Sequence, residues 1–431
     1  MHLWLIPMVY VAASVGCGLA LPRIEQAYLG SYTFNLSVTS AQACLSAAAS
    51  GMMALTGVVF AMAFVMVQFS AIAYSPRLVL WFARDHVLFH SLGAFAATFI
   101  YALFTLAWID RGGSGTVPLF STLLVAIMLI FSMLLFSRLV QRMTDLQITS
   151  VLQLIGDKGR KVIRDTFRHL DKRPVAECEI ESAGGVLLGP ISQTLVYSGH
   201  PRTIAEFNTD GLLRQAQRSG GVIVMACAVG DTLLEGSVVL RIHGGKDKLA
   251  EKDLMWAVHL AAGRTFEQDP KYPIRLLVDI AIKALSPAIN DPTTAVQAID
   301  QIEDLLRHLA RHNLDAGFAR DPDGVLRVVV PMPTWDDYLT LAFDEIRQFG
   351  MSSVQVIRRL RAALTGLAGS TTIAAYAEAA RRYLKHLDVV IERSPLDSED
   401  KVTALQEDPQ GLGLSRQRPD ALLASMSAGH T

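Results

Sequence analysis

The stretch GMMALTGVVFAMAFVMVQFSAIAY, Gly51 to Tyr74, decides the fold class of this chain. It contains no Asp, Glu, Lys or Arg, and it is longer than the roughly 20 residues with which a helix crosses the hydrocarbon of a bilayer. Three similar apolar runs share the first third of the sequence: Met1 to Leu21, His86 to Ile109 and Val117 to Phe136. We therefore predict four transmembrane helices within residues 1–140, with the lipid bilayer as a partner.

The composition places the whole chain between a soluble protein and a fully embedded one. Of its 431 residues, 51% are hydrophobic and 18% are charged, so we expect a membrane part and a water-exposed part. The formal net charge of -1 gives no general basic surface, and nucleic acid is not expected as a partner. The cysteines (Cys17, Cys44, Cys178, Cys227) have no CxxC spacing, so neither a zinc site nor a disulfide framework is indicated, and no cofactor is predicted.

The basic residues near the apolar runs predict the orientation in the membrane. The first run could instead be a secretory signal, but it has no Lys or Arg before its apolar part and three more spans follow it. Basic residues follow the second and fourth runs, where the positive-inside rule places the cytoplasm (Arg77, Arg84, Arg138, Arg142, Lys158, Arg160). We expect a multi-pass protein of a bacterial inner membrane, with the N-terminus and the C-terminal part cytoplasmic.

The second span carries the candidate transport surface. No acidic or basic residue interrupts any of the four apolar runs, which disfavours a carboxylate-driven transporter. Ala41 to Tyr74 could form one helix of about 50 Å, which is longer than the hydrocarbon layer is thick. At spacings of three and four it presents a stripe of small residues with one bulky aromatic ring and one amide (Ser50, Ala54, Gly57, Ala61, Phe64, Gln68). Such a stripe is typical either of close helix packing or of a pore lining in a homo-oligomer.

Two histidine pairs have a spacing that would suit a metal. His86 and His90, and likewise His308 and His312, are four residues apart and would share one face of a helix. No third ligand is apparent near either pair, so we predict no metal site.

The remaining sequence indicates a cytoplasmic α+β part with distinct segments. A basic amphipathic helix pattern continues from Leu139 to about Leu170, and residues 141–175 are assigned to this connecting helix. Residues 176–245 contain short β-branched runs and glycines, which predict a small β domain with one helix capped by Thr209 or Asp210. Residues 246–393 have helical patterns, and Thr334, followed three residues later by Asp337, is expected to cap one of these helices. The polar residues 394–431 are expected to be a disordered tail.

Part of the small β domain resembles biotinyl and lipoyl domains. VGDTLLEGSVVLRI resembles their strand, turn and strand, and IESAGGVLLGPI resembles the strand before it. The resemblance implies a hybrid β-sandwich shape. It does not extend to the modified lysine of those families, because HGGKDK around Lys246 does not match their lysine hairpin.

The stretch ALSPAINDPTTA, Ala284 to Ala295, is the candidate ligand loop. It gathers five polar residues between and after two prolines (Ser286, Asn290, Asp291, Thr293, Thr294). A structural interpretation also accounts for them: Pro287 ends one helix, and Asp291 caps the next helix with Pro292 at its first position. No His or Cys lies in the loop to form a nucleophile pair, so we expect scaffold or the binding of an ion or small ligand, and no catalysis.

Several of these stretches resemble one known family. GVVFAMAFVMVQFSAIAYSPRLV, RTFEQDPKYPIRLLVDIAIKALSPAINDPTTA and VGDTLLEG are together similar to a bacterial family of predicted membrane proteins classed as a domain of unknown function. The resemblance extends from the first helix to about residue 390, and SPAINDPTTA is its most specific part. It implies four N-terminal membrane helices and a cytoplasmic domain, and it implies no reaction.

Two classes of function follow from the sequence. A homo-oligomeric ion channel would use the second span as its pore lining and the cytoplasmic part as a regulatory domain. A membrane-anchored sensor or scaffold would use the spans for anchorage and the cytoplasmic part to bind a ligand or partner. An enzyme ranks third, because no P-loop, GxSxG, HExxH or nucleotide glycine fingerprint is present.

Overall fold

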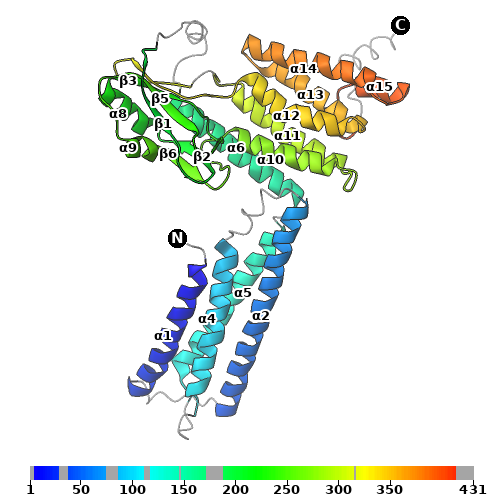
Figure 1. The fold of residues 1–431 in the computed structure, drawn as a ribbon. Helices are drawn as coiled ribbons and strands as arrows, with labels where there is room; N and C mark the ends of the chain where they lie inside the picture. Colours follow the sequence, from blue (N-terminus) through cyan, green and yellow to red (C-terminus); the bar gives the residue numbers. More distant parts are fainter. Residues whose placement is uncertain are drawn as a thin grey trace, which may run out of the picture. The chain divides into compact units, whose positions relative to one another are not determined.

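The computed structural model describes residues 4–28, 37–73, 86–110, 117–144, 147–170, 188–314 and 317–413. The chain divides into two compact units, Met1–Ser150 and Val151–Thr431 (Figure 1).

The first unit consists of long apolar helices. They are α1 (Leu5–Tyr28), α2 (Val38–Ala73), α4 (His86–Trp108) and α5 (Leu119–Thr144). Among the described residues, these four helices are long and apolar enough to cross a membrane. The chain therefore has the four candidate membrane spans that the sequence predicted. The 36 residues of α2 form one uninterrupted helix of about 54 Å, in agreement with the expected extra length.

Helix α4 forms the centre of this unit. Half of its most apolar window is buried inside the unit, against 17% for each of the other three helices, and α4 packs on α1, α2 and α5. Two glycines allow α1 and α4 to approach closely. A Cβ atom on Gly93 would lie 2.8 Å from the ring of Tyr10, and one on Gly18 would lie 2.8 Å from Phe104. Small residues thus serve helix packing in this unit.

Polar side chains also join the helices of the first unit. The Ser14 hydroxyl donates to the Ala97 carbonyl at 2.6 Å, between α1 and α4. At the end of α1, the Glu25 carboxylate accepts from the backbone N–H groups of Phe120 and Ser121 at 2.8 and 3.1 Å. Those amides belong to the first turn of α5 and have no partner within the helix, so Glu25 caps α5.

Helix α6 (Ile148–Leu170) lies mostly in the second unit, whose described residues form two sheets. Their strands are β1 (Ile191–Val196), β2 (Arg202–Phe207), β3 (Gly221–Met225), β4 (Thr232–Leu233), β5 (Val238–Gly244), β6 (Val258–Ala261), β7 (Phe318–Arg320) and β8 (Leu326–Val329). The larger sheet has the order β1-β5-β3-β8-β7, and the smaller has the order β4-β2-β6. Among the described strands, β3 and β8 pair in parallel and the other pairs are antiparallel.

This arrangement does not confirm the biotinyl and lipoyl likeness. The strands of VGDTLLEGSVVLRI, β4 and β5, belong to different sheets, and β5 pairs with β1 and β3. The larger sheet is completed by β7 and β8, which come from far downstream in the sequence. Most of IESAGGVLLGPI falls outside the described residues.

Two short helices flank these strands: α8 (Thr209–Ser219) and α9 (Glu251–Trp256). Helix α8 packs on β3, β7 and β8. The predicted caps of α8 are wrong, because Asn208 is the residue whose side chain accepts from the Gly211 N–H at 2.9 Å. Asn208, Thr209 and Asp210 are all good capping residues, and the end of β2 at Phe207 places the first of them at the cap.

The rest of the second unit is helical. It contains α10 (Lys271–Ala284), α11 (Pro292–Leu309), α12 (Trp335–Gly350), α13 (Val354–Ser370), α14 (Ala374–Arg393) and α15 (Ser398–Ala404). Helix α10 packs on α11 and α12, α11 packs on α13, and α13 packs on α14 and α15 (Figure 1). At the start of α12, Thr334 and Asp337 form a capping box, as their spacing in the sequence suggested.

Helix α6 packs closely on the helical part of the second unit. A Cβ atom on Gly159 would lie 2.7 Å from Leu305 of α11 and 3.1 Å from Pro273 of α10, so the glycine permits the contact. The Phe167 ring stacks on His312 with 5.0 Å between the ring centroids. The sequence predicted one continuous helix from Leu139 to Leu170, but α5 ends at Thr144 and α6 begins at Ile148. Helix α5 is apolar on all sides, which suits lipid, whereas α6 is apolar on one side, which suits packing on other helices.

The expected disordered tail is wrong for residues 394–413. This segment contains α15, and its Asp408 side chain is 1% exposed. The Asp408 carboxylate accepts from the backbone N–H groups of Gln410, Gly411 and Gly413, which closes a compact turn. A polar segment can therefore be ordered when its side chains satisfy its own backbone. Residues 414–431 lie outside the described part of the chain.

Candidate functional site

The stripe predicted on α2 lies on the exposed side of that helix. All six of its residues are exposed in the single chain: Ser50, Ala54, Gly57, Ala61, Phe64 and Gln68. The Phe64 side chain is 64% exposed. Helix α2 packs on α4, and its buried residues lie on another face (Ala41, Leu45, Ala49, Met52, Val59, Met66). The stripe is therefore not a packing seam within the chain, and it is available to lipid or to another copy.

The ALSPAINDPTTA corner connects α10 with α11. The carboxylate of Asp291 accepts from the Thr294 N–H at 3.1 Å and from the Thr294 hydroxyl at 2.6 Å. Pro292 is the first residue of α11, as predicted. Asn290 adopts a φ of 49°, a left-handed conformation that asparagine tolerates better than most residues. Helix α10 ends at Ala284, shortly before Pro287, which was expected to end it.

The five candidate ligand residues of this corner do not converge on the pocket described below. The Ser286 hydroxyl donates to the Lys283 carbonyl at 2.7 Å, and both oxygens of Asp291 are engaged by Thr294. The side chains of Asn290 and Thr293 are exposed. The capping interpretation accounts for Asp291, and a ligand role for the corner stays a prediction.

The histidine pairs have neighbours other than a metal. The Nδ1 atom of His90 lies 3.2 Å from the Tyr10 hydroxyl, and His308 lies 3.8 Å from Asp304, the residue one turn before it. Burial lowers the pKa of His308 and of His312, which favours their neutral forms. Within the described ranges, no group of three His, Cys, Asp or Glu side chains is placed to hold a metal ion.

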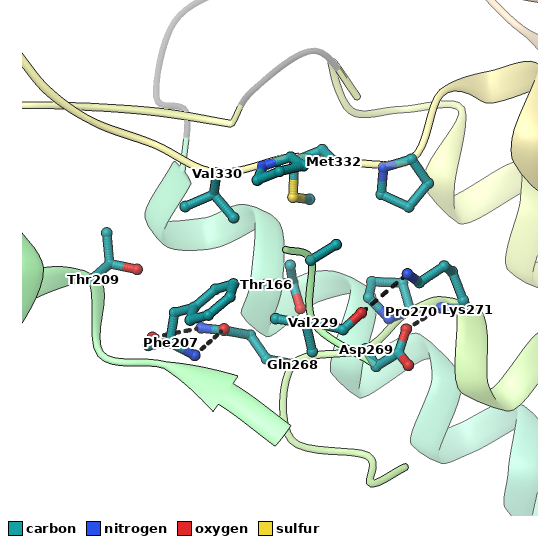
Figure 2. Close-up of a pocket in the computed structure, with 13 residues that line it drawn as sticks. Thr166, Phe207, Thr209, Val229, Gln268, Asp269, Pro270, Lys271, Val330 and Met332 are labelled. Carbon is teal, nitrogen blue, oxygen red and sulfur yellow. Dashed lines mark hydrogen bonds between the residues drawn. The ribbon is translucent and has the colours of Figure 1, made fainter. Parts of the chain in front are cut away.

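A pocket in the second unit brings together residues that the sequence did not assign to a functional site. Its lining comes from α6, the end of β2, the β3–β4 connection, the start of α10 and the segment after β8 (Figure 2). Gln268 fixes one wall, because its amide accepts from the Phe207 N–H at 2.9 Å and donates to the Phe207 carbonyl at 3.3 Å. On another wall, the Lys271 ammonium donates to the Val229 carbonyl at 3.0 Å.

A buried carboxylate lies at the start of α10 beside this pocket. The Asp269 side chain is 1% exposed, and it accepts from the Arg264 guanidinium at 2.8 Å and from the Lys271 N–H at 3.1 Å. Burial raises the pKa of Asp269, while the charges of Lys271 and Arg264 oppose that rise. Gly230 makes this approach possible. It has a φ of +89°, and a Cβ atom there would lie 2.4 Å from the Asp269 carboxylate.

The hydroxyl of Thr166 distinguishes this pocket from an ordinary packing defect. Thr166 lies on α6 and is 5% exposed, and its Oγ1 atom has no hydrogen-bond partner among the described residues. A buried hydroxyl without a partner costs free energy, and a polar lining is what distinguishes a wet or ligand-binding cavity from a dry one. Sequence reasoning missed this site because its residues come from five separate segments. The only local signal was the helix start in QDPKYP, Gln268 to Pro273.

Comparisons with known proteins give a family without an assigned activity. A family model described as "Predicted membrane protein (DUF2254)" matches residues 1–366. Two curated relatives are an uncharacterized protein, Rv1290c, of Mycobacterium tuberculosis and an uncharacterized protein, Mb1321c, of Mycobacterium bovis. Each is 25% identical over 379 residues, which cover 85% of this chain and 71% of the relative. No solved structure matches the chain.

Proposed function

This chain belongs to that family of predicted membrane proteins, and from this premise we propose that it is a homo-oligomeric ion channel whose α2 helices line a central axis. One observation carries the proposal: all six stripe residues face away from the helices of their own chain. Small residues on an outward stripe permit close approach of a second copy, and several copies around an axis can leave a water-filled path.

The residues of the stripe suit a narrow pore with a hydrophobic gate. The small side chains of Ser50, Ala54 and Gly57 leave room around an axis, whereas Phe64 would narrow it. A ring of aromatic side chains can close a pore by excluding water. Gln68, one turn further on, would then provide a ring of amides. The stripe has no acidic or basic ring, so its residues favour neither cations nor anions.

Replacing Phe64 by alanine is expected to increase ion flux, because the proposed constriction would widen. The measurement is planar-bilayer recording of the purified wild type and variant, with native mass spectrometry to confirm equal assembly. Val65→Ala is a matched control, since Val65 is 51% exposed at nearly the same depth but points about 100° away around the helix. Ala61→Glu should shift selectivity toward cations. Intact oligomers that conduct in neither form would end the channel proposal.

The proposed orientation places the N-terminus and the second unit in the cytoplasm of a bacterial inner membrane. It is supported by Arg138 and Arg142 at the end of α5, because basic residues concentrate on the cytoplasmic side. A single cysteine introduced near Gly113 should react with a membrane-impermeant reagent from outside intact cells, and one at Lys158 should not. The opposite labelling pattern would reject this orientation.

A membrane-anchored sensor or scaffold is the second candidate function. The observation that favours it is the pocket of the second unit, with its buried Asp269 and its Thr166 hydroxyl without a partner among the described residues. In this case the exposed face of α2 would contact lipid. Phe64→Ala would then change neither flux nor assembly, which separates this candidate from the channel.

A further inference from the structure

We propose that the pocket between α6, the end of β2 and the start of α10 binds a small carboxylate with a short apolar chain. The site lies entirely in the second unit and does not depend on whether the protein conducts ions.

Two side chains of the pocket lining, Thr166 and Lys271, can donate hydrogen bonds to a ligand. The Thr166 hydroxyl, buried in the wall, has no partner among the described residues. The Lys271 ammonium uses one of its three N–H groups to donate to the Val229 carbonyl. In contrast, the acceptor of Gln268 is engaged by the Phe207 N–H. The Thr166 hydroxyl can donate or accept, whereas the Lys271 ammonium can only donate, so an acceptor oxygen is the ligand group that both side chains can bind.

The local charge favours an anionic acceptor. Among the charged side chains that line the pocket or pair with Asp269, Asp269 contributes one negative charge and Arg264 and Lys271 contribute two positive charges, which leaves this group with a net charge of about +1. The positive end of the α10 dipole adds to this, because Lys271 is the first residue of that 14-residue helix. The first amides of α10 are not the ligands. The N–H groups of Lys271 and Tyr272 already donate to Asp269, and residue 273 is a proline.

The shape of the cavity sets the size of the ligand. Its volume is about 30 Å³, two to three times the ~10–15 Å³ that one water needs on this measure, so it accepts a carboxylate head. Most of the remaining lining is apolar and includes Phe207, Val330 and Met332 (Figure 2). The cavity is not fully enclosed, and an apolar chain can lie along these walls toward the opening. The usual pattern of a ligand site, an apolar lining with a few convergent polar groups, is thus present.

The test uses the full chain in lipid nanodiscs with sodium acetate, butyrate, isovalerate and hexanoate at constant ionic strength. Thermal unfolding should show a saturable rise in Tm with the acids of four to six carbons. Titration calorimetry should show binding about tenfold weaker or worse for Thr166→Val and for Lys271→Met, since each removes a donor to a charged group. Thr149→Val on α6 and Lys283→Met on α10 are matched controls outside the pocket and should bind normally.

Each outcome of this test decides the proposal. Without ligand, Thr166→Val should unfold at the same temperature as the wild type or higher, because it removes a buried hydroxyl without a partner among the described residues. A lower Tm for this variant would mean that the hydroxyl serves the fold, and would overturn the inference. So would the absence of a saturable Tm shift with every acid, or an equal shift in the pocket variants. Isovaleramide that binds as well as isovalerate would overturn the assignment to carboxylates.

Discussion

Replacing Arg359 by alanine is expected to lower the free energy of unfolding of the second unit by about 3 kcal/mol or more. Arg359 lies on α13 and is 5% exposed. Its guanidinium donates to Asp300 at 2.7 Å and to Glu303 at 2.6 Å, both on α11. Glu303 is itself 9% exposed, so removing the arginine leaves a buried carboxylate with less compensation. Loss of the packed aliphatic stem adds to the cost.

The crowding around this network leaves little room for water to replace the arginine. Glu303 also accepts from Arg307, at 2.6 and 2.9 Å. A Cβ atom on Gly366 of α13 would lie 2.5 Å from the Arg307 guanidinium and 2.7 Å from the Glu303 carboxylate. These charged side chains therefore lie at the centre of the α11–α13 contact. Removal of the Arg359 side chain would leave a cavity between the two packed helices.

The measurement is pulse proteolysis of the full chain in nanodiscs over a urea series, which reports unfolding of the second unit. Arg381→Ala is the matched control. Arg381 pairs with Glu378 at 3.1 Å, but both side chains are more than half exposed, so the loss should be about 0.5 kcal/mol or less. Equal effects of the two variants would show that the buried network contributes no more than a surface ion pair.

Local sequence patterns predicted those parts of the fold whose causes are local. The four apolar runs became α1, α2, α4 and α5, since each had the length and composition of a span. Asp291 and Thr334 cap α11 and α12, because a cap is decided by a few consecutive residues. The family resemblance stated from the SPAINDPTTA segment is confirmed by the family match.

Long-range pairing was beyond local patterns. Strand β8 lies beside β3 in parallel, with Ile223 opposite Val328, although more than 100 residues separate them in sequence. The residues of neither strand identify the other strand as its pairing partner. The pocket shows the same limit, since Thr166, Phe207 and Met332 come together only through the packing of α6, β2 and the segment after β8.

Replacing Arg358 by alanine is expected to release the C-terminal segment 398–413 from α13 while the remaining helices stay folded. Arg358 is 2% exposed, and its guanidinium donates to the backbone carbonyls of Gly413 at 2.8 Å and Gln406 at 3.4 Å. Hydrogen bonds from a charged donor to a carbonyl are stronger than neutral ones. These two bonds hold the segment on α13 at Gln406 and at Gly413. Without them, the segment has little apolar area with which to stay docked.

Hydrogen exchange of the full chain, read by mass spectrometry, measures this release directly. Amides of residues 398–413 should exchange about tenfold faster or more in Arg358→Ala, whereas those of α11 should not change. Gly411→Ala tests the docking of the segment at a second position, where it contacts α11. Gly411 has a φ of +66°, and a Cβ atom there would lie 2.2 Å from Val296 of α11, so alanine cannot keep the docked conformation. Val402→Ala, at a side chain that is 62% exposed, is the control and should leave exchange unchanged.

The result distinguishes a detachable segment from a part of the core. The family match ends at residue 366, before this segment begins, so the docked turn is an addition to the region that the family model describes. If the segment is detachable, Arg358 regains water when it leaves, because the segment itself covers part of the guanidinium. Both variants would then speed exchange only in residues 398–413. Faster exchange throughout α11 and α13 would instead show that Arg358 and Gly411 support the helical core, and that the segment cannot leave without unfolding it.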